Sequence, residues 1–224
     1  SYSDHGTVTV NNIWFRSVLD DYQNITFAEN GSLNRSFCAV GDYVYVASRS
    51  ENSTSANIYL RKYDGKTGEI VSDIILGDEG KIAYYPCNTV VKDSKGNVCI
   101  ANLSLNISST PIVLHKVDLE TGNLTQLASM TYSGTTSRCD HIALTGDVST
   151  GNFKVFAGFA KSKRVVRWSF TNGVLSNTEN CSLKSFYPSG LSNPGTAPLV
   201  IPIDDNTFFF KGGDTQLTKY SFTN

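Results

Sequence analysis

The chain has 224 residues, of which 40% are hydrophobic and 11% aromatic, so it can bury a full core without a metal ion or a disulfide. Only 17% of the residues are charged and the formal net charge is −1, which leaves no basic field for phosphates and disfavours nucleic-acid binding. No apolar run approaches the roughly 18 residues that a membrane helix needs, and residues 1–6 lack a signal-peptide pattern, so we expect a soluble, already processed segment.

Residues 36–77 form the first of four similar units. Turn-forming residues divide this unit into four short β-rich segments, which we expect to be strands at 37–40, 43–47, 58–63 and 70–76. The sequences GD at 41–42 and GKTG at 65–68 supply the small and polar residues that tight turns need. The unit therefore predicts a four-stranded antiparallel sheet.

Three further units follow at 87–130, 139–183 and 197–224. The expected strands of the second unit are 88–91, 98–102, 112–117 and 124–127, and those of the third are 141–144, 153–159, 165–170 and 174 onward. The fourth unit ends where the third begins its outermost strand, so that strand is missing. Residues 7–15 belong to no unit and are expected to pair there if the ring closes.

The second segment of each unit recurs at a nearly constant distance. These segments end at residues 47, 101, 157 and 211, so successive ends lie 54, 56 and 54 positions apart. A repeat of this length built from strands is typical of a β-propeller, and no stretch has a sustained helical period. We therefore predict an all-β fold in a single domain, residues 1–224, with four blade repeats of about 54 residues. The blades form either a closed four-bladed ring or part of a larger propeller.

Glycosylation acceptor sequences favour an exported protein. The pattern Asn-x-Ser/Thr occurs eight times, at Asn24, Asn30, Asn34, Asn52, Asn102, Asn106, Asn123 and Asn180.

The five cysteines contain no CxxC pair, so a zinc knuckle or a thioredoxin-type motif is not expected. Cys87 and Cys139 each come just before an expected innermost strand. Two interpretations stay open for this pair: two unpaired thiols, which is the simpler one, or a disulfide between neighbouring blades.

In a propeller, the loops that enter each innermost strand and the loops between second and third strands share one face around the axis. Loops on a rigid scaffold commonly carry the binding residues. The candidate ligand-binding residues on this face are Arg35, Arg49, Tyr84, Tyr85, Asn88, Asn102, Arg138, Asp140, His141, Tyr187 and Lys211.

Two of these loops contain Tyr-Pro, at residues 85–86 and 187–188. Aromatic rings beside polar groups suit stacking against sugar rings, whose C–H faces are apolar while their hydroxyl groups need partners. The alternative is that each tyrosine packs on the blade below it and the proline stiffens the loop.

Arg138, Cys139, Asp140 and His141 form the densest set of reactive side chains. Arg138, Asp140 and His141 are weak catalytic candidates, because strand alternation sends residues 139 and 141 to one side and Asp140 to the other. A polar lining of the channel is the simpler interpretation. The acidic turns at 93–97 and 204–206 lack a calcium-loop pattern and are expected to be tight turns, so no metal or cofactor is predicted.

Short phrases at 39–49 and 98–104, with the sequence IWF at 13–15 and Arg35, resemble an uncharacterised β-propeller family found in surface lipoproteins of gut bacteria. The resemblance covers about residues 11–130. Members of that family are longer and have more blades, which favours the larger-propeller alternative. The resemblance implies export and placement at a bacterial surface, and the family offers no established catalytic residues.

These observations predict an exported, non-enzymatic binding or scaffolding propeller, extracellular or periplasmic, with lipid anchoring outside this segment as one option. Its loop face would be presented to a glycan or a partner protein. The alternative is a polysaccharide lyase or hydrolase that uses channel-facing Arg138, Asp140 and His141.

Overall fold

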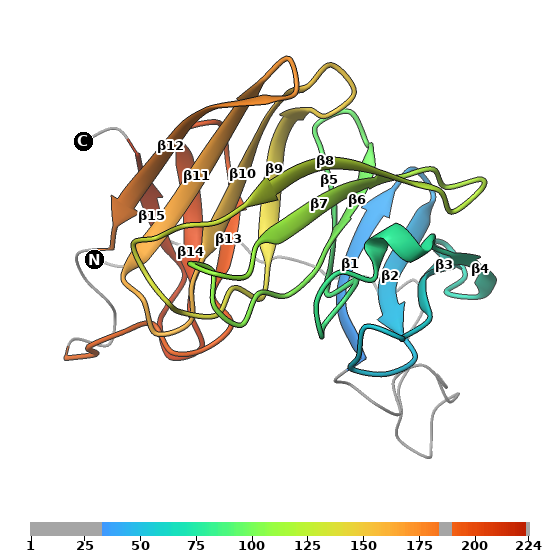
Figure 1. Ribbon diagram of the computed structural model, residues 1–224, viewed down its shortest axis with the longest axis horizontal. Coiled ribbons are helices and arrows are strands. Elements are labelled where there is room, and N and C mark those ends of the chain that lie inside the picture. Colours follow the sequence, from blue (N-terminus) through green and yellow to red (C-terminus); the bar gives the residue numbers. More distant parts are fainter. Residues whose placement is uncertain (1–32, 184–189, 223–224) are drawn as a thin grey trace, which may run out of the picture.

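The computed structural model describes residues 33–183 and 190–222. In this part of the chain, strands β1–β15 form four antiparallel sheets arranged as the blades of a β-propeller (Figure 1). The only helical element among the described residues is the short 3-10 turn η2 (Asp78–Gly80). The prediction of an all-β propeller with four blades is confirmed.

The first two blades have four strands each, in chain order across the sheet. Blade 1 consists of β1 (Asn34–Val40), β2 (Tyr43–Arg49), β3 (Ile58–Asp64) and β4 (Ile70–Ile75). Blade 2 consists of β5 (Thr89–Lys92), β6 (Val98–Ala101), β7 (Ile112–Val117) and β8 (Leu124–Met130).

Blade 3 again has four strands, whereas blade 4 has three, β13-β14-β15, in the described residues. Blade 3 consists of β9 (Ile142–Asp147), β10 (Asn152–Gly158), β11 (Arg164–Thr171) and β12 (Val174–Ser182). Blade 4 consists of β13 (Leu199–Pro202), β14 (Thr207–Lys211) and β15 (Thr218–Ser221). Residues 7–15, the expected closing strand, lie outside the described residues.

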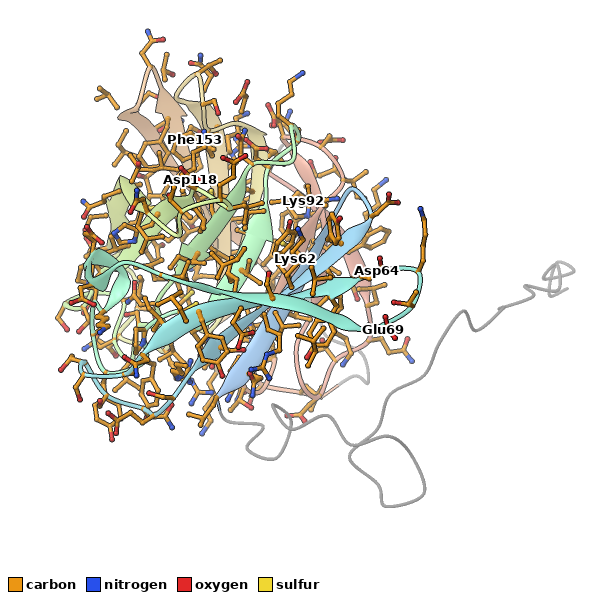
Figure 2. The ribbon with its side chains drawn as sticks, turned by 90° about the vertical axis from the view of Figure 1, so that its right-hand side faces the viewer. Lys62, Asp64, Glu69, Lys92, Asp118 and Phe153 are labelled. Carbon is orange, nitrogen blue, oxygen red and sulfur yellow. The ribbon has the colours of Figure 1, made fainter. Side chains whose placement is uncertain are left out.

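In blades 1 and 2, the turn between the third and fourth strands is held by an aspartate at the strand end. In blade 1, the Asp64 carboxylate accepts the backbone N–H groups of Lys66 and Thr67 at 2.8 and 2.9 Å. Figure 2 shows Asp64 and Glu69 at this turn, where the Asp64 N–H also donates to the Glu69 carbonyl. Gly68 has a φ of 72°, a conformation that glycine adopts without a steric cost.

A second aspartate, Asp93, joins two blades. Its carboxylate accepts N–H groups of Lys95 and Asn97 inside the β5–β6 turn, at 2.8 and 2.9 Å, and the N–H of Val148 from blade 3, at 2.9 Å. Asp93 is buried, and these hydrogen bonds occupy the oxygens that a calcium ion would need. The expectation of tight turns at 93–97 agrees with this geometry.

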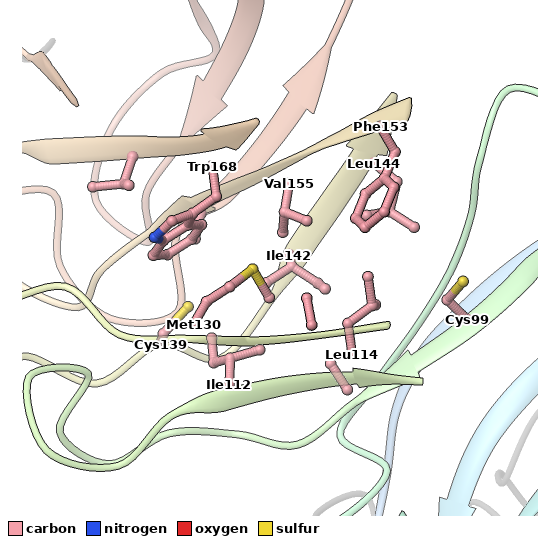
Figure 3. Packing of buried hydrophobic residues seen from close by; sticks show 14 of the residues in the cluster. Cys99, Ile112, Leu114, Met130, Cys139, Ile142, Leu144, Phe153, Val155 and Trp168 are labelled. Carbon is pink, nitrogen blue, oxygen red and sulfur yellow. The ribbon is translucent and has the colours of Figure 1, made fainter. Parts of the chain in front are cut away.

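Apolar side chains fill each of the three interfaces between consecutive blades. The largest cluster lies between blades 2 and 3, where Leu114, Met130, Val155 and Trp168 pack together (Figure 3). Separate clusters lie between blades 1 and 2 and between blades 3 and 4. Packing on both faces explains why β6 and β7 are buried at nearly every position and why β6 is apolar throughout.

The innermost strands follow one another around the axis. β1 contacts β5, β5 contacts β9 and β9 contacts β13. Within the described part of the chain, β13 and β1 do not pack against each other in this way, so the arrangement is open between blades 4 and 1.

The two end faces of this open arrangement carry exposed apolar side chains. On blade 1, Phe37 lies on the side away from blade 2 and is 72% exposed, because its neighbour Cys38 takes the buried side. On blade 4, Leu199 and Ile201 are exposed in the same way, while Val200 packs towards blade 3. Placement of these blades in a larger propeller stays a prediction.

Candidate functional site

The candidate site lies on the face of the propeller where loops enter the innermost strands. These loops contain three non-glycine residues with positive φ, Ala83 (64°), Cys87 (47°) and Ala197 (48°), and the β10–β11 loop on the same face contains Lys161 (55°). Such conformations are costly for residues with a Cβ atom, and they occur disproportionately at binding and catalytic sites. Four of the five non-glycine residues with positive φ that the structure describes thus lie on the loop face, and the fifth, Asn172, lies in the β11–β12 turn.

A chain of hydrogen bonds joins the first three blades at this face. Arg49, at the end of β2, donates from its guanidinium to the Asn88 side-chain oxygen at 3.2 Å and to the Pro86 carbonyl at 3.3 Å. The Asn88 amide donates to the Asp140 carbonyl at 2.8 Å, and the Thr89 hydroxyl donates to the same oxygen at 2.9 Å. Arg49, Asn88 and Thr89 are buried, so these bonds replace water that the groups lose on folding.

The Asp140 carboxylate brings together two arginines from different blades. Its Oδ2 accepts a hydrogen bond of 2.8 Å from Nε of Arg138, and its Oδ1 lies 3.6 Å from a terminal nitrogen of Arg35 on β1. The Asp140 side chain is 0% exposed, whereas those of Arg35 and Arg138 are 33% and 37% exposed. One buried carboxylate thus holds two guanidinium groups that both reach the surface.

His141 lies in the field of this cluster. Burial lowers the pKa of its imidazole, Asp140 opposes that effect, and Arg35 and Arg138 add to the lowering. The imidazole is therefore neutral at pH 7, with one nitrogen able to accept a hydrogen bond and the other able to donate one.

Two tyrosines form the rim of the site beside Arg49. The rings of Tyr84 and Tyr85 meet edge to face with centroids 4.8 Å apart, and the Arg49 guanidinium lies 5.6 Å from the centre of the Tyr85 ring. Tyr84 is 55% exposed. Tyr85 therefore packs on the structure, as the packing interpretation has it, while Tyr84 presents aromatic surface to the solvent. Tyr187 lies outside the described residues.

The Asn102 side chain shapes a loop of blade 2. It is buried, accepts the N–H of Val113 at 2.8 Å and donates to the carbonyls of Leu103 and Pro111 at 3.2 and 3.0 Å. Lys211, at the end of β14, donates to the carbonyls of Gly212 and Gly213. Both side chains hold local backbone in place.

Cys87 and Cys139 are unpaired thiols, so the disulfide alternative is wrong. Cys87 packs in the cluster between blades 1 and 2, whereas Cys139 packs in the cluster between blades 2 and 3, where Figure 3 shows it near Met130 and Ile112. A whole blade thus separates the two sulfur environments. Burial raises the pKa of both thiols, that of Cys87 to about 12, which removes them as nucleophiles at neutral pH.

The site combines hydrogen-bond donors, positive charge and one exposed aromatic ring. The described residues contain no group of three or more His, Cys, Asp or Glu side chains that could hold a metal ion. Sequence reasoning missed Asn52, which accepts a hydrogen bond of 2.8 Å from Nε of Arg49, and Thr89. Thr89 has no distinguishing sequence signal, and Asn52 has only a glycosylation acceptor pattern, which does not indicate a hydrogen bond with Arg49.

The described residues contain no helix with the length and apolarity needed to cross a bilayer. Hydrogen bonds and packing hold together the part of the chain that the structure describes.

Comparison with solved structures supports the fold. The chain is similar to a DUF4623 family protein from Bacteroides eggerthii, with a TM-score of 0.67 and 19% identity over 92% of this chain and 46% of that one. It spans less than half of that protein's length. Lower similarity, with TM-scores of 0.45 and 0.43, extends to α-L-arabinofuranosidases from Podospora anserina and Coprinopsis cinerea, at 10% and 15% identity. These matches cover 86% and 84% of this chain and 65% and 63% of the two enzymes.

No curated protein matches the chain. A family model does match, over residues 18–205, and its description is Domain of unknown function (DUF8500). Because the match covers well over half of the sequence, the chain belongs to this family.

Proposed function

We propose that the chain is an exported, non-enzymatic binding propeller that presents its loop face to a glycan or a partner protein at a bacterial surface. The observation that carries this proposal is the cluster of Arg35, Arg138 and Asp140, which holds two partly exposed guanidinium groups on the loop face that also presents the exposed ring of Tyr84. Binding surfaces for sugars commonly combine fixed hydrogen-bond donors with an aromatic ring.

The same cluster is poorly equipped for nucleophilic or acid–base catalysis with its own carboxylate. The Asp140 side chain is fully buried between two arginines: Oδ2 accepts a hydrogen bond from Arg138, and Oδ1 lies 3.6 Å from Arg35, so neither oxygen is exposed to a substrate. The Cys139 thiol is buried, and burial raises its pKa. A binding role uses the arrangement as it stands.

One observation favours a lyase as the second candidate. A polysaccharide lyase needs a neutral base and a cation that neutralises a substrate carboxylate, and here His141, neutral at pH 7, lies close to Arg35 and Arg138. Incubation with uronate polysaccharides, followed by ultraviolet absorbance of the unsaturated product, tests this role. If the wild-type protein cleaves the polysaccharide and the His141→Gln protein does not, the lyase role replaces the binding proposal.

A glycan array followed by isothermal titration tests the leading proposal. Wild-type protein should bind at least one polysaccharide, and Tyr84→Ala should weaken that binding by about tenfold, as expected for loss of one stacking side chain. Tyr43→Ala serves as the control, because Tyr43 lies at the start of β2, on the opposite face. Absence of binding to all glycans and to surface-protein extracts would overturn the proposal.

A further inference from the structure

The polar network at the loop face contains more positive than negative charge. Arg35 and Arg138 share the Asp140 carboxylate, and Arg49 joins the same network through Asn88, which donates to the Asp140 backbone carbonyl. His141 adds no charge at neutral pH, because burial lowers its pKa. The cluster as a whole is therefore cationic, on a chain whose formal net charge is −1.

The excess charge lies on side chains that a ligand can reach. Arg49 is buried and hydrogen-bonded to Asn52, Asn88 and Pro86, so it serves as fixed internal charge. Arg35 and Arg138 each keep about a third of the side chain exposed. A guanidinium has five N–H donors, and the contact with Asp140 uses only part of them.

The buried carboxylate also limits how these two arginines move. Arg138 is held by a 2.8 Å hydrogen bond and Arg35 by an ion pair of 3.6 Å to the same residue. Two guanidinium groups fixed around one point lose less conformational entropy when they bind a ligand than two free surface arginines would lose. Burial lowers the pKa of both Arg49 and His141, and the charge of Arg35 adds to the lowering in each case.

We infer that Arg35 and Arg138 bind an oxyanion of the ligand, so that the glycan recognised by this face is an acidic polysaccharide. This inference rests on the proposed function and adds the ligand's chemical class. Planar guanidinium groups match the oxygen spacing of carboxylate and sulfate groups and form charge-assisted hydrogen bonds with them. Uronate carboxylates and sulfate esters share this chemistry, while Tyr84 supplies an apolar surface for the sugar ring.

Isothermal titration against three polymers separates the sources of the anion. Polygalacturonate carries carboxylates, dextran sulfate carries sulfate esters, and unmodified dextran carries neither. We expect binding to at least one acidic polymer and none to dextran, with affinity that falls as salt rises. Arg35→Gln and Arg138→Gln should each lower that affinity by about tenfold or more, the effect expected for one charge-assisted contact.

Arg164→Gln is the matched control, because it removes the same charge from an exposed arginine that pairs with Asn180 and Ser182 on the outer strand of blade 3. It should bind as wild type does. If Arg138→Gln fails to fold, as shown by circular dichroism, Arg35→Gln and the salt dependence still decide the question.

Equal affinity for dextran and the acidic polymers, or wild-type affinity in a folded Arg35→Gln protein, would overturn the inference but leave a glycan-binding role in place. Binding only to an acidic protein would also overturn it. Absence of binding to any polymer or protein would remove the proposed function as well.

Discussion

Replacing Asp140 by asparagine tests whether burial or contact geometry decides the strength of an ion pair in this propeller. The Asp140 side chain is 0% exposed and faces Arg138 at 2.8 Å and Arg35 at 3.6 Å. Asparagine keeps the volume but removes the negative charge that both guanidinium groups share. A hydrogen bond to a charged group contributes about 1.5–3 kcal/mol, so we expect the free energy of unfolding to fall by about 2 kcal/mol, with both arginines partly hydrated.

Asp73→Asn is the comparison that separates the two factors. Asp73 on β4 receives two hydrogen bonds of 2.7 Å from Arg61, a better geometry than that at Asp140, but its side chain is 33% exposed. Exposed ion pairs contribute about 0.2–1 kcal/mol, because water and salt screen them. The Asp73→Asn protein should therefore lose less than half as much stability as the Asp140→Asn protein.

Urea unfolding gives both free energies, provided that the slope with denaturant is the same in all three proteins. In thermal unfolding, about 2 kcal/mol corresponds to a shift of about 4–8 °C for a chain of this size. If Asp140→Asn protein is as stable as wild type while Asp73→Asn protein is clearly weaker, geometry outweighs burial and the reasoning fails.

Three further predictions concern the end faces, the turns and the histidines. Phe37→Ala should change the free energy of unfolding by less than about 0.5 kcal/mol, because Phe37 is exposed. Phe156→Ala should lower it by about 3–5 kcal/mol, because Phe156 is fully buried. Equal losses in calorimetry would mean that the end face of blade 1 around Phe37 is buried against another part of the protein. Asp93→Ala should cost about 1–3 kcal/mol in urea unfolding, because three backbone N–H groups lose their acceptor, and an unchanged midpoint would contradict this. Stability should fall as the pH drops below about 6.5, because burial lowers the pKa of His141 and His115 in the folded state and the unfolded chain therefore binds protons first. His141→Asn should reduce this pH dependence of stability. An unchanged pH profile in the His141→Asn protein would contradict the role of His141.

The repeat made most of the fold predictable. Strand alternation and turn residues placed β2, β3 and β7 within two residues of their observed ends, because each unit repeats the same packing problem and solves it with the same residue types. The sequence predicts that the outermost strand of blade 2 ends at residue 127, whereas β8 continues to Met130. The residues beyond the predicted end, Ala128, Ser129 and Met130, pair with β7, and Ala128 and Met130 are buried in the cluster between blades 2 and 3, so the length of the strand follows from these long-range contacts.

The site was predictable only as a set of positions on one face. Loop topology assigns Arg35, Asn88 and Asp140 to one face, but their pairing depends on contacts between residues far apart in the sequence, 52 positions for Asn88 and Asp140, which no local pattern encodes. Asn102 shows the limit of that method. Its side chain forms hydrogen bonds with backbone groups of Leu103, Pro111 and Val113 and so holds the loop before β7.

The repeats also show where this propeller departs from its own symmetry. Two positions after the second strand segment, blade 1 has Arg49, blade 2 has Leu103, blade 3 has Phe159 and blade 4 has Gly213. Arg49, Leu103 and Phe159 are all buried, so three equivalent backbone positions hold a cation and two apolar groups. Because Arg49 has no charged counterpart at the equivalent positions of the other three blades, a ligand on the loop face meets unequal surroundings around the axis. An acidic ligand should therefore bind in one orientation, with its anionic group at Arg35 and Arg138.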